Sequence, residues 1–60
     1  MDRLRAKEIS ESPVMANVMY QGTPIYIQNV DGPAETARVY PLDQPENEQD
    51  VQLAHLIEVQ

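Results

Sequence analysis

The chain has 60 residues, ten of them acidic and four basic, and carries a formal net charge of −6. A chain this short forms one domain and buries only about 60% of the surface that its unfolded form exposes, so tight packing or self-association must stabilise it. It has no cysteine, which excludes disulfides and thiolate metal sites, and its single histidine, His55, cannot hold zinc alone. No apolar run approaches the roughly 20 residues that span a bilayer, and no secretory apolar region is present, so we expect a soluble intracellular protein without a membrane partner.

Residues 1–12 predict a short helix, with Asp2 as its N-cap. The residues that follow the cap are good helix formers. Ser12 precedes Pro13, which pushes Ser12 out of the helical region, so we expect the helix to end by about Ser10.

Basic residues are concentrated in this helix, where Arg3, Arg5 and Lys7 lie; only Arg38 follows them. We interpret the three as a solvated helix end, and an arm for an acidic partner is the alternative. Proteins that bind nucleic acids neutralise phosphates with Lys and Arg. DNA or RNA binding by the folded body is therefore disfavoured.

Residues 14–42 predict a three-strand meander. Period-two alternation over residues 14–20 indicates its first strand, and residues 23–30 form the second. Gln21 and Gly22 between them predict a two-residue turn, since Gly22 can adopt a positive φ. This turn fixes the register, and the expected pairs are Tyr20 with Thr23, Val18 with Ile25 and Ala16 with Ile27 on one face, and Met19 with Pro24 and Asn17 with Tyr26 on the other.

The sequence "DGPAE" (residues 31–35) predicts the second turn, and residues 36–42 predict the third strand. We expect this hairpin to pair Val30 with Thr36, Gln28 with Arg38, Ile27 with Val39 and Tyr26 with Tyr40. The two tyrosines then lie together on the outer face, whereas Tyr20 lies at the inner rim.

The acidic stretch "DQPENEQD" (residues 43–50) reads as a solvated connector. It lacks the glycine and the bidentate glutamate spacing of a calcium loop, so we expect no metal there. Residues 51–59 predict a short strand, a 3₁₀-like turn around Ala54 to Leu56 and a last short strand. A C-terminal helical turn is the alternative.

The layout predicts a mainly β fold with a short N-terminal helix. At this size the expected architecture is a small SH3-like half-open barrel of four to five antiparallel strands, with residues 1–60 as a single domain. The predicted core consists of Leu4, Ile9, Val14, Ala16, Val18, Ile25, Ile27, Val39, Val51, Leu53, Leu56 and Ile57.

No residue pattern indicates catalysis or a cofactor. Ser10 and Ser12 flank the expected helix end, where local backbone hydrogen bonds are their usual role. His55 lies between apolar residues in the expected last turn and reads as a surface or structural histidine. Gly22 and Gly32 are the only glycines, so a glycine-rich phosphate loop is excluded. We therefore expect a protein that is not an enzyme and has no cofactor.

The outer face of the meander is the candidate interaction face. Its predicted members are Asn17, Met19, Tyr26, Arg38 and Tyr40. Cross-strand aromatic pairing, or cover by the N-terminal helix, would make this face structural. Self-association as a homodimer is a second interpretation. Binding of a peptide or protein, as SH3-like barrels often do, is a third, although it rests on the fold alone.

Four sequence blocks, "RAKEISESP" (residues 5–13), "GTPIYIQNVD" (22–31), "ARVYPLDQPENE" (37–48) and "VQLAHLIE" (51–58), carry a family resemblance. With them the chain resembles the H-type small acid-soluble spore proteins of endospore-forming Gram-positive bacteria. It departs from the expected pattern at "DGPAE", where relatives tend to be more acidic. The resemblance implies synthesis in the forespore during sporulation and residence in the spore core.

The resemblance supplies no catalytic or binding motif. The predicted β domain and its charge of −6 do not resemble the DNA-coating α/β-type spore proteins, nor the low-complexity γ-type storage proteins. The leading hypothesis is a non-enzymatic structural or interaction protein of the spore core, with a second copy or an unknown core protein as partner. The alternatives are a peptide-binding module that uses Tyr26 and Tyr40, a nucleic-acid-associated protein, which the charge disfavours, and an amino-acid store.

Overall fold

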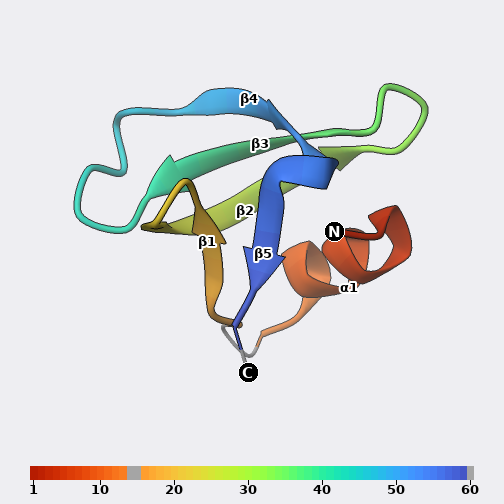
Figure 1. Ribbon diagram of the computed structural model, residues 1–60, viewed down its shortest axis with the longest axis horizontal. Coiled ribbons are helices and arrows are strands. Elements are labelled where there is room, and N and C mark those ends of the chain that lie inside the picture. Colours follow the sequence, from red (N-terminus) through yellow and green to blue (C-terminus); the bar gives the residue numbers. More distant parts are fainter. Residues whose placement is uncertain (14–15, 60) are drawn as a thin grey trace.

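The computed structural model describes residues 1–13 and 16–59. Its elements are α1 (Arg3–Glu11), β1 (Val18–Tyr20), β2 (Thr23–Asp31), β3 (Thr36–Pro41), β4 (Gln49–Gln52), a 3₁₀ turn (Leu53–His55) and β5 (Leu56–Glu58). The strands form one antiparallel sheet in the order β4-β3-β2-β1-β5. Figure 1 shows that this sheet curls, with α1 at its open side. The predicted mainly β half-open barrel with an N-terminal helix is therefore confirmed.

The first hairpin has the predicted register. Val18 pairs with Ile25, Met19 with Pro24 and Tyr20 with Thr23. Gln21 and Gly22 both have a positive φ, 50° and 79°, which matches the twist of the flanking strands in a two-residue turn. The strand is shorter than expected, because β1 begins at Val18 and the expected pairs of Ala16 and Asn17 are not part of its ladder. Residues 14 and 15, including the predicted core residue Val14, lie outside the described residues.

The second hairpin keeps the predicted register over only part of its length. The expected pairs of Ile27 with Val39 and of Tyr26 with Tyr40 are present. Beyond Ile27, the prediction is wrong by one residue, as three observed pairs show: Asn29 with Arg38, Val30 with Ala37 and Asp31 with Thr36.

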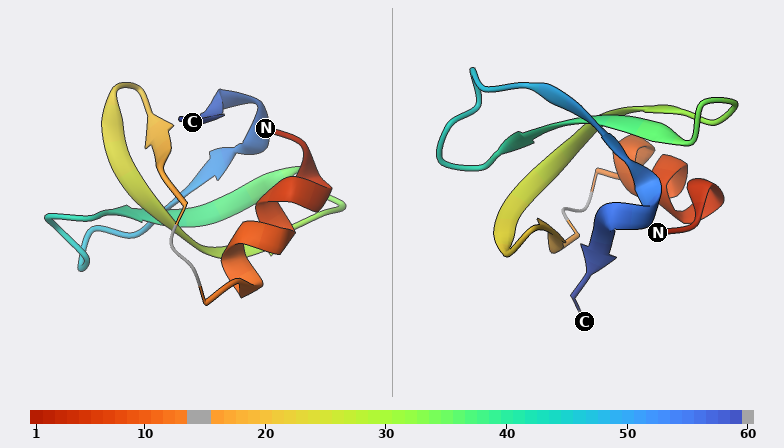
Figure 2. Two further views of the ribbon diagram at one scale, coloured as in Figure 1. Left: turned by 90° about the horizontal axis from the view of Figure 1, so that it is seen from below. Right: turned by 45° about the horizontal axis from the view of Figure 1, so that its top comes forward.

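An irregularity in β2 causes this shift, since the register changes between Ile27 and Asn29. Gln28 is the extra residue, so it does not face Arg38, and Val30 does not face Thr36 as expected. A bulge of this kind bends its strand and increases the local twist. The bend contributes to the curl of the sheet that Figure 2 shows from two further directions.

The C-terminal segment has the predicted order of strand, 3₁₀ turn and strand, and the alternative of a helical turn is wrong. β4 begins at Gln49, two residues earlier than expected, inside the predicted acidic loop. The Leu53 backbone N–H donates to the Glu35 carbonyl at 3.0 Å, which joins the 3₁₀ turn to the second hairpin.

The core contains eight of the predicted residues: Ile9, Val18, Ile25, Ile27, Val39, Val51, Leu53 and Leu56. Ala16 is half-buried and packs against them. Tyr20 also packs against the core, as expected for an inner-rim residue.

Leu4 and Ile57 were predicted in the core but are 73% and 64% exposed. In α1 the buried side chains are Ala6 and Ile9, which are three residues apart and share a helix face that Leu4 does not share. In β5 the side chains alternate, so Ile57 points away from the core that Leu56 enters. Ala6 and Ala37, both fully buried, were missed because small side chains give a weak apolar signal.

Contacts from Met1 and from the first turn of α1 hold the helix against the C-terminal segment. The Met1 amino group donates to the carbonyl oxygens of Leu53 and Leu56, at 2.7 and 3.3 Å. The Arg5 guanidinium binds the Glu58 carboxylate through two contacts, Nε to Oε1 at 2.9 Å and Nη2 to Oε2 at 2.6 Å. Asp2 occupies the N-cap position, but its side chain makes no capping hydrogen bond. Within residues 1–13 and 16–59, no helix has the length and apolar character to cross a membrane.

Candidate interaction face

Tyr26 and Tyr40 lie directly opposite each other on β2 and β3. Their ring centroids are 5.3 Å apart and their planes are inclined by 35°, within the range that aromatic pairs prefer. Both rings are half-buried, and the neighbouring residues Ile25, Ile27 and Val39 point into the core. The pair therefore lies on the outer side of the curled sheet, as predicted.

The helix reaches one side of this pair. Ile9, Ser12 and Pro13 line, together with Tyr26, a hollow of about 270 Å³. Tyr40 does not line that hollow. The end of α1 therefore borders the tyrosine pair and does not cover it.

Apolar residues continue from the tyrosines across the same side of the sheet. Met19 pairs with Pro24 of β2 and with Ile57 of β5, so these three side chains form a row. The Leu42 N–H donates to the Pro24 carbonyl at 3.3 Å, which places Leu42 at the end of the row. We call this surface the outer apolar face; its residues are Met19, Pro24, Tyr26, Tyr40, Leu42, Ile57 and Val59.

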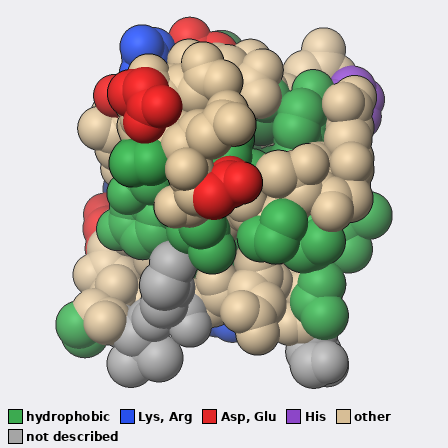
Figure 3. Space-filling view, turned by 90° about the vertical axis from the view of Figure 1, so that its left-hand side faces the viewer, with side chains coloured by type: hydrophobic (Ala, Val, Ile, Leu, Met, Phe, Trp, Pro, Cys, Tyr) green, Lys and Arg blue, Asp and Glu red, His purple; other side chains and the backbone are tan. Residues whose placement is uncertain are grey.

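Figure 3 views the molecule from the side of the β1–β2 turn and the β3–β4 connection. Hydrophobic side chains spread over much of this side, with acidic side chains beside them and basic ones only at the margins. Leu42 and Val59 are nearly half exposed, at 46% and 47%. Large apolar side chains thus meet solvent next to carboxylates.

A hollow of about 250 Å³ lies within this surface. It is lined by Ala16, Asn17, Val18, Met19, Pro24, Ile25, Leu42 and Val59. The Val59 N–H donates to the Asn17 carbonyl at 2.8 Å, which holds the C-terminal segment at the rim. The hollow is smaller than the roughly 300–1,000 Å³ of small-molecule pockets, and its apolar lining suits a single aliphatic side chain.

Arg38 lies at the polar end of the outer side of β3. Its Nε donates to Glu48 at 2.9 Å, and its Nη1 lies 3.4 Å from the nearer Asp50 oxygen. The hydrogen bond with Glu48, followed by the charge of Asp50, raises the pKa of Arg38 above its ordinary value. Of the five residues predicted for the face, Met19, Tyr26 and Tyr40 are thus brought together, Asn17 lies at the edge of the hollow, and Arg38 is turned toward two carboxylates.

The β3–β4 connection places uncompensated carboxylates next to Leu42. Asp43 and Glu46 make no ion pair in the part of the chain that the structure describes. Successive turns fix the connection: Gln44 N–H donates to the Pro41 carbonyl at 3.1 Å and Asn47 N–H to the Gln44 carbonyl at 2.9 Å. The outer apolar face therefore has an ordered acidic rim.

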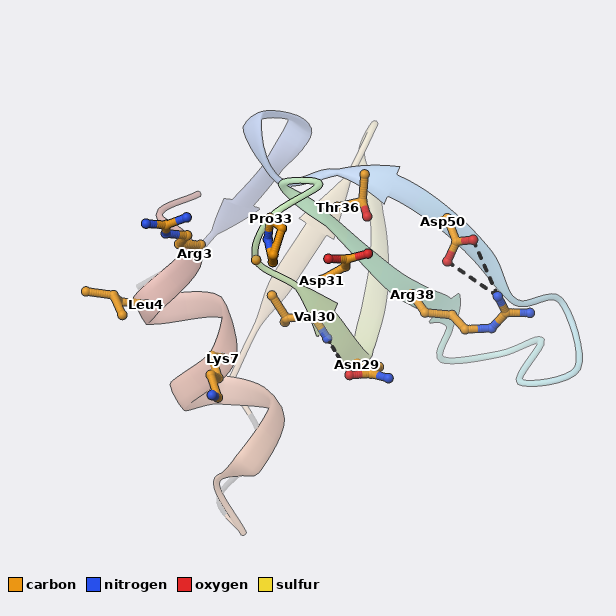
Figure 4. A pocket seen from close by; sticks show the side chains of 11 residues that line it. Arg3, Leu4, Lys7, Asn29, Val30, Asp31, Pro33, Thr36, Arg38 and Asp50 are labelled. Atoms are coloured by element: carbon orange, nitrogen blue, oxygen red, sulfur yellow. Dashed lines mark hydrogen bonds and ion pairs between the residues drawn. The ribbon is translucent and has the colours of Figure 1, made fainter.

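A broader groove of about 800 Å³ separates α1 from the polar end of β2 and β3. Figure 4 shows Arg3, Leu4 and Lys7 on the helix side of this groove, with Asp31 and Asp50 on the sheet side. Leu4 points away from the sheet. Among the described residues, Arg3 and Lys7 make no ion pair, in contrast to Arg5 and Arg38.

The sequence interpretation missed the exposure of Leu4, Leu42, Ile57 and Val59. Leu42 follows Tyr40 by two residues, and alternation alone would have placed it on the outer side. His55 is exposed in the 3₁₀ turn. Over residues 1–13 and 16–59, no group of three or more His, Asp or Glu side chains could hold a metal ion.

The fold and this face define a small half-barrel β protein that presents an acid-rimmed apolar surface. Residues 1–58 match the Small acid-soluble spore protein H family, and the chain belongs to this family. No solved structure matches the chain.

Relatives named small, acid-soluble spore protein H cover nearly all of the chain. The protein of Halalkalibacterium halodurans is 67% identical over 54 residues, which is 90% of each chain. That of Bacillus licheniformis is 62% identical over 58 residues, covering 97% of this chain and 98% of its own. That of Bacillus subtilis is 57% identical with the same coverage. The predicted family resemblance is thereby confirmed, and the chain is a spore protein by family.

Proposed function

We propose that this chain is a non-enzymatic protein of the spore core, made in the forespore during sporulation, which acts by binding another protein molecule. The observation that carries the proposal is the outer apolar face, where Leu42, Ile57 and Val59 remain about half or more exposed next to the tyrosine pair. Family membership supports the setting, since the relatives are spore proteins by name.

Apolar patches of this kind on small proteins often serve contacts with other proteins. Tyr and Met are enriched in protein interfaces, whereas charged residues are depleted from the interface centre and the rim is polar. The outer apolar face has this arrangement, with Met19 and two tyrosines inside and Asp43 and Glu46 outside. A protein partner is therefore the class of ligand that the face fits.

The test is capture of partners from spore extract with the tagged protein. Leu42→Asp places a charge in the lining of the hollow of the outer apolar face, at a position exposed enough to keep the fold. The double variant Tyr26→Ala, Tyr40→Ala removes the rings. Both should lose the captured protein, whereas Glu35→Gln, in the exposed β2–β3 turn at the opposite end of the sheet from the β3–β4 connection (Figure 1), should retain it. Equal recovery with all variants would rule out this face as the binding surface. Fractionation of spores then tests the core location, which a protein found only in the outer layers would contradict.

A nucleic-acid-bound role has less support. Of the four basic residues, all of which are described, Arg5 and Arg38 are held by carboxylates. Arg3 and Lys7 remain, and two cations give only a weak salt-dependent contact with phosphates. A gel shift with duplex DNA at low salt would favour this role, and its absence would remove it.

A further inference from the structure

The first turn of α1 presents an apolar side chain between two uncompensated cations. Leu4 is 73% exposed and points away from the molecule's own sheet (Figure 4). Arg3 and Lys7 are four residues apart and therefore lie on one face of the helix with Leu4 beside them. Among the described residues they make no ion pair. We call Arg3, Leu4 and Lys7 the basic knob.

The outer apolar face offers the complementary features. Its hollow of about 250 Å³ is lined by Met19, Pro24, Leu42 and Val59, among others, and so accepts one aliphatic side chain. Asp43 and Glu46 lie on the connection that follows Leu42 and make no ion pair in the described part of the chain. A leucine flanked by cations matches this surface in size, polarity and charge.

One molecule cannot bring these two surfaces together. In Figure 1, α1 lies on the right of the sheet, whereas the β3–β4 connection lies at its far left. The contact must therefore form between molecules. Pairing of two outer apolar faces is disfavoured, because it would bring Asp43 and Glu46 of both copies toward each other in a protein of net charge −6.

We propose that the chain associates with itself head to tail, with the basic knob of one copy in the hollow of the outer apolar face of the next. This inference rests on the proposed function and names the partner as a second copy. Each molecule carries both halves of the contact, so the interface is heterologous and association continues beyond a dimer, into a ring or a filament.

Complementing variants test this geometry. Leu4→Asp removes the knob and keeps the hollow, and Leu42→Asp spoils the hollow and keeps the knob. Leu4 is 73% and Leu42 is 46% exposed. Far-UV circular dichroism and a thermal melt verify the fold of each variant, and Leu4→Ser and Leu42→Ser replace any variant that fails this check. The mass of each protein is measured by light scattering and sedimentation up to about 1 mM, which covers weak association.

The wild type should grow past the mass of a dimer with concentration, and each variant alone should stay monomeric. Their equimolar mixture should stop at a 1:1 heterodimer, because it contains one intact knob and one intact hollow. Loss of one buried leucine should weaken association by roughly 10- to 100-fold. Two double variants test the charges. Arg3→Glu with Lys7→Glu reverses the charge of the knob, and Asp43→Lys with Glu46→Lys reverses the charge of the rim. Each double variant alone should associate more weakly than the wild type, and mixing the two should restore association.

A wild type that stays monomeric throughout would overturn the inference. The inference would also be overturned if Leu4→Asp still associated while Leu42→Asp did not, because the basic knob would then play no part in the contact. In either case, capture of a different spore protein that depends on Leu42 would leave the proposed function standing. If no protein were captured and the wild type also stayed monomeric, both the head-to-tail association and the proposed protein-binding function would be rejected.

Discussion

Among residues 1–13 and 16–59, three turn residues have left-handed backbone conformations. Gly22 adopts φ 79° at no steric cost, but Gln21 and Glu35 hold φ values of 50° and 55° with full side chains. This conformation costs an ordinary residue about 1–2 kcal/mol. At Glu35 the neighbouring bonds impose it: its N–H donates to the Gly32 carbonyl at 3.1 Å, and its carbonyl accepts from Leu53.

Glu35→Gly should therefore stabilise the protein. Both backbone hydrogen bonds remain, and the left-handed strain of about 1–2 kcal/mol disappears. The glycine also raises the entropy of the unfolded chain, which offsets part of this gain. The free energy of unfolding should therefore rise by about 0.5–1 kcal/mol. Urea unfolding followed by circular dichroism measures it. Ala34→Gly is the matched control, because Ala34 has no positive φ, and it should lower stability instead. Equal destabilisation by both variants would show that Glu35 is not strained.

The sequence reveals the phase of a strand better than the phase of this helix. In β2, Ile25 and Ile27 alternate with polar or aromatic neighbours, so their burial could be predicted from a period of two. Leu4 and Ile9 are five residues apart, which places them about 140° apart around a helix of 3.6 residues per turn. Only one of them can face the sheet, and the fully buried Ala6 decides which.

At the scale of elements, the links between distant segments have no signal in the sequence. Arg5 and Glu58 are 53 residues apart, yet two hydrogen bonds join them and fasten α1 to β5. Arg5 also contacts Glu8 within the helix. The shift at Gln28 leaves only a weak trace in the sequence: Val30, which packs against the core, follows Ile27 by three residues and so breaks the period of two. The outer apolar face likewise depends on the pairing of β1 with β5.

The contact between α1 and β5 should depend on pH through Glu58. Hydrogen bonding by Arg5 lowers the pKa of the Glu58 carboxyl below its ordinary value of 4.5. A group with a lowered folded-state pKa stabilises the fold above its unfolded pKa, and this stabilisation is lost as the pH falls through the folded-state pKa. The same contacts raise the pKa of Arg5, and that stabilisation is lost only in strong alkali.

Glu58→Gln should therefore be less stable than the wild type at pH 7, and the difference should shrink as the pH falls below about 4. Thermal unfolding at pH 7, 5 and 3 gives the comparison. Glu11→Gln is the control, because its carboxylate makes no ion pair among the described residues. A gap between Glu58→Gln and the wild type that stays constant down to pH 3 would contradict the role of the Glu58 charge.

For the whole molecule, α1 belongs to the core and is not an appendage. Ala6 and Ile9 are buried in the same cluster as Val18, Ile27 and Leu56. A nine-residue helix is too short to be stable alone, so its order depends on this packing. In return, the helix closes the open side of the curled sheet, as Figure 2 shows. The helix and the barrel should therefore unfold together.

Ile9→Ala tests this dependence against Leu4→Ala, a substitution in the same helix at an exposed position. Removing a buried isoleucine costs about 2–5 kcal/mol, a large part of the roughly 3–9 kcal/mol expected for 60 residues. Leu4→Ala should change stability by less than about 0.5 kcal/mol. Circular dichroism reports the helix, and tyrosine fluorescence reports the barrel through Tyr20, Tyr26 and Tyr40. Within each variant the two signals should have the same urea midpoint. The measurement needs dilute protein so that association does not contribute. If Ile9→Ala melted the helix while the tyrosine signal kept the wild-type midpoint, the barrel would be stable independently of α1. The basic knob would then lie on a mobile arm and not on a fixed part of the surface.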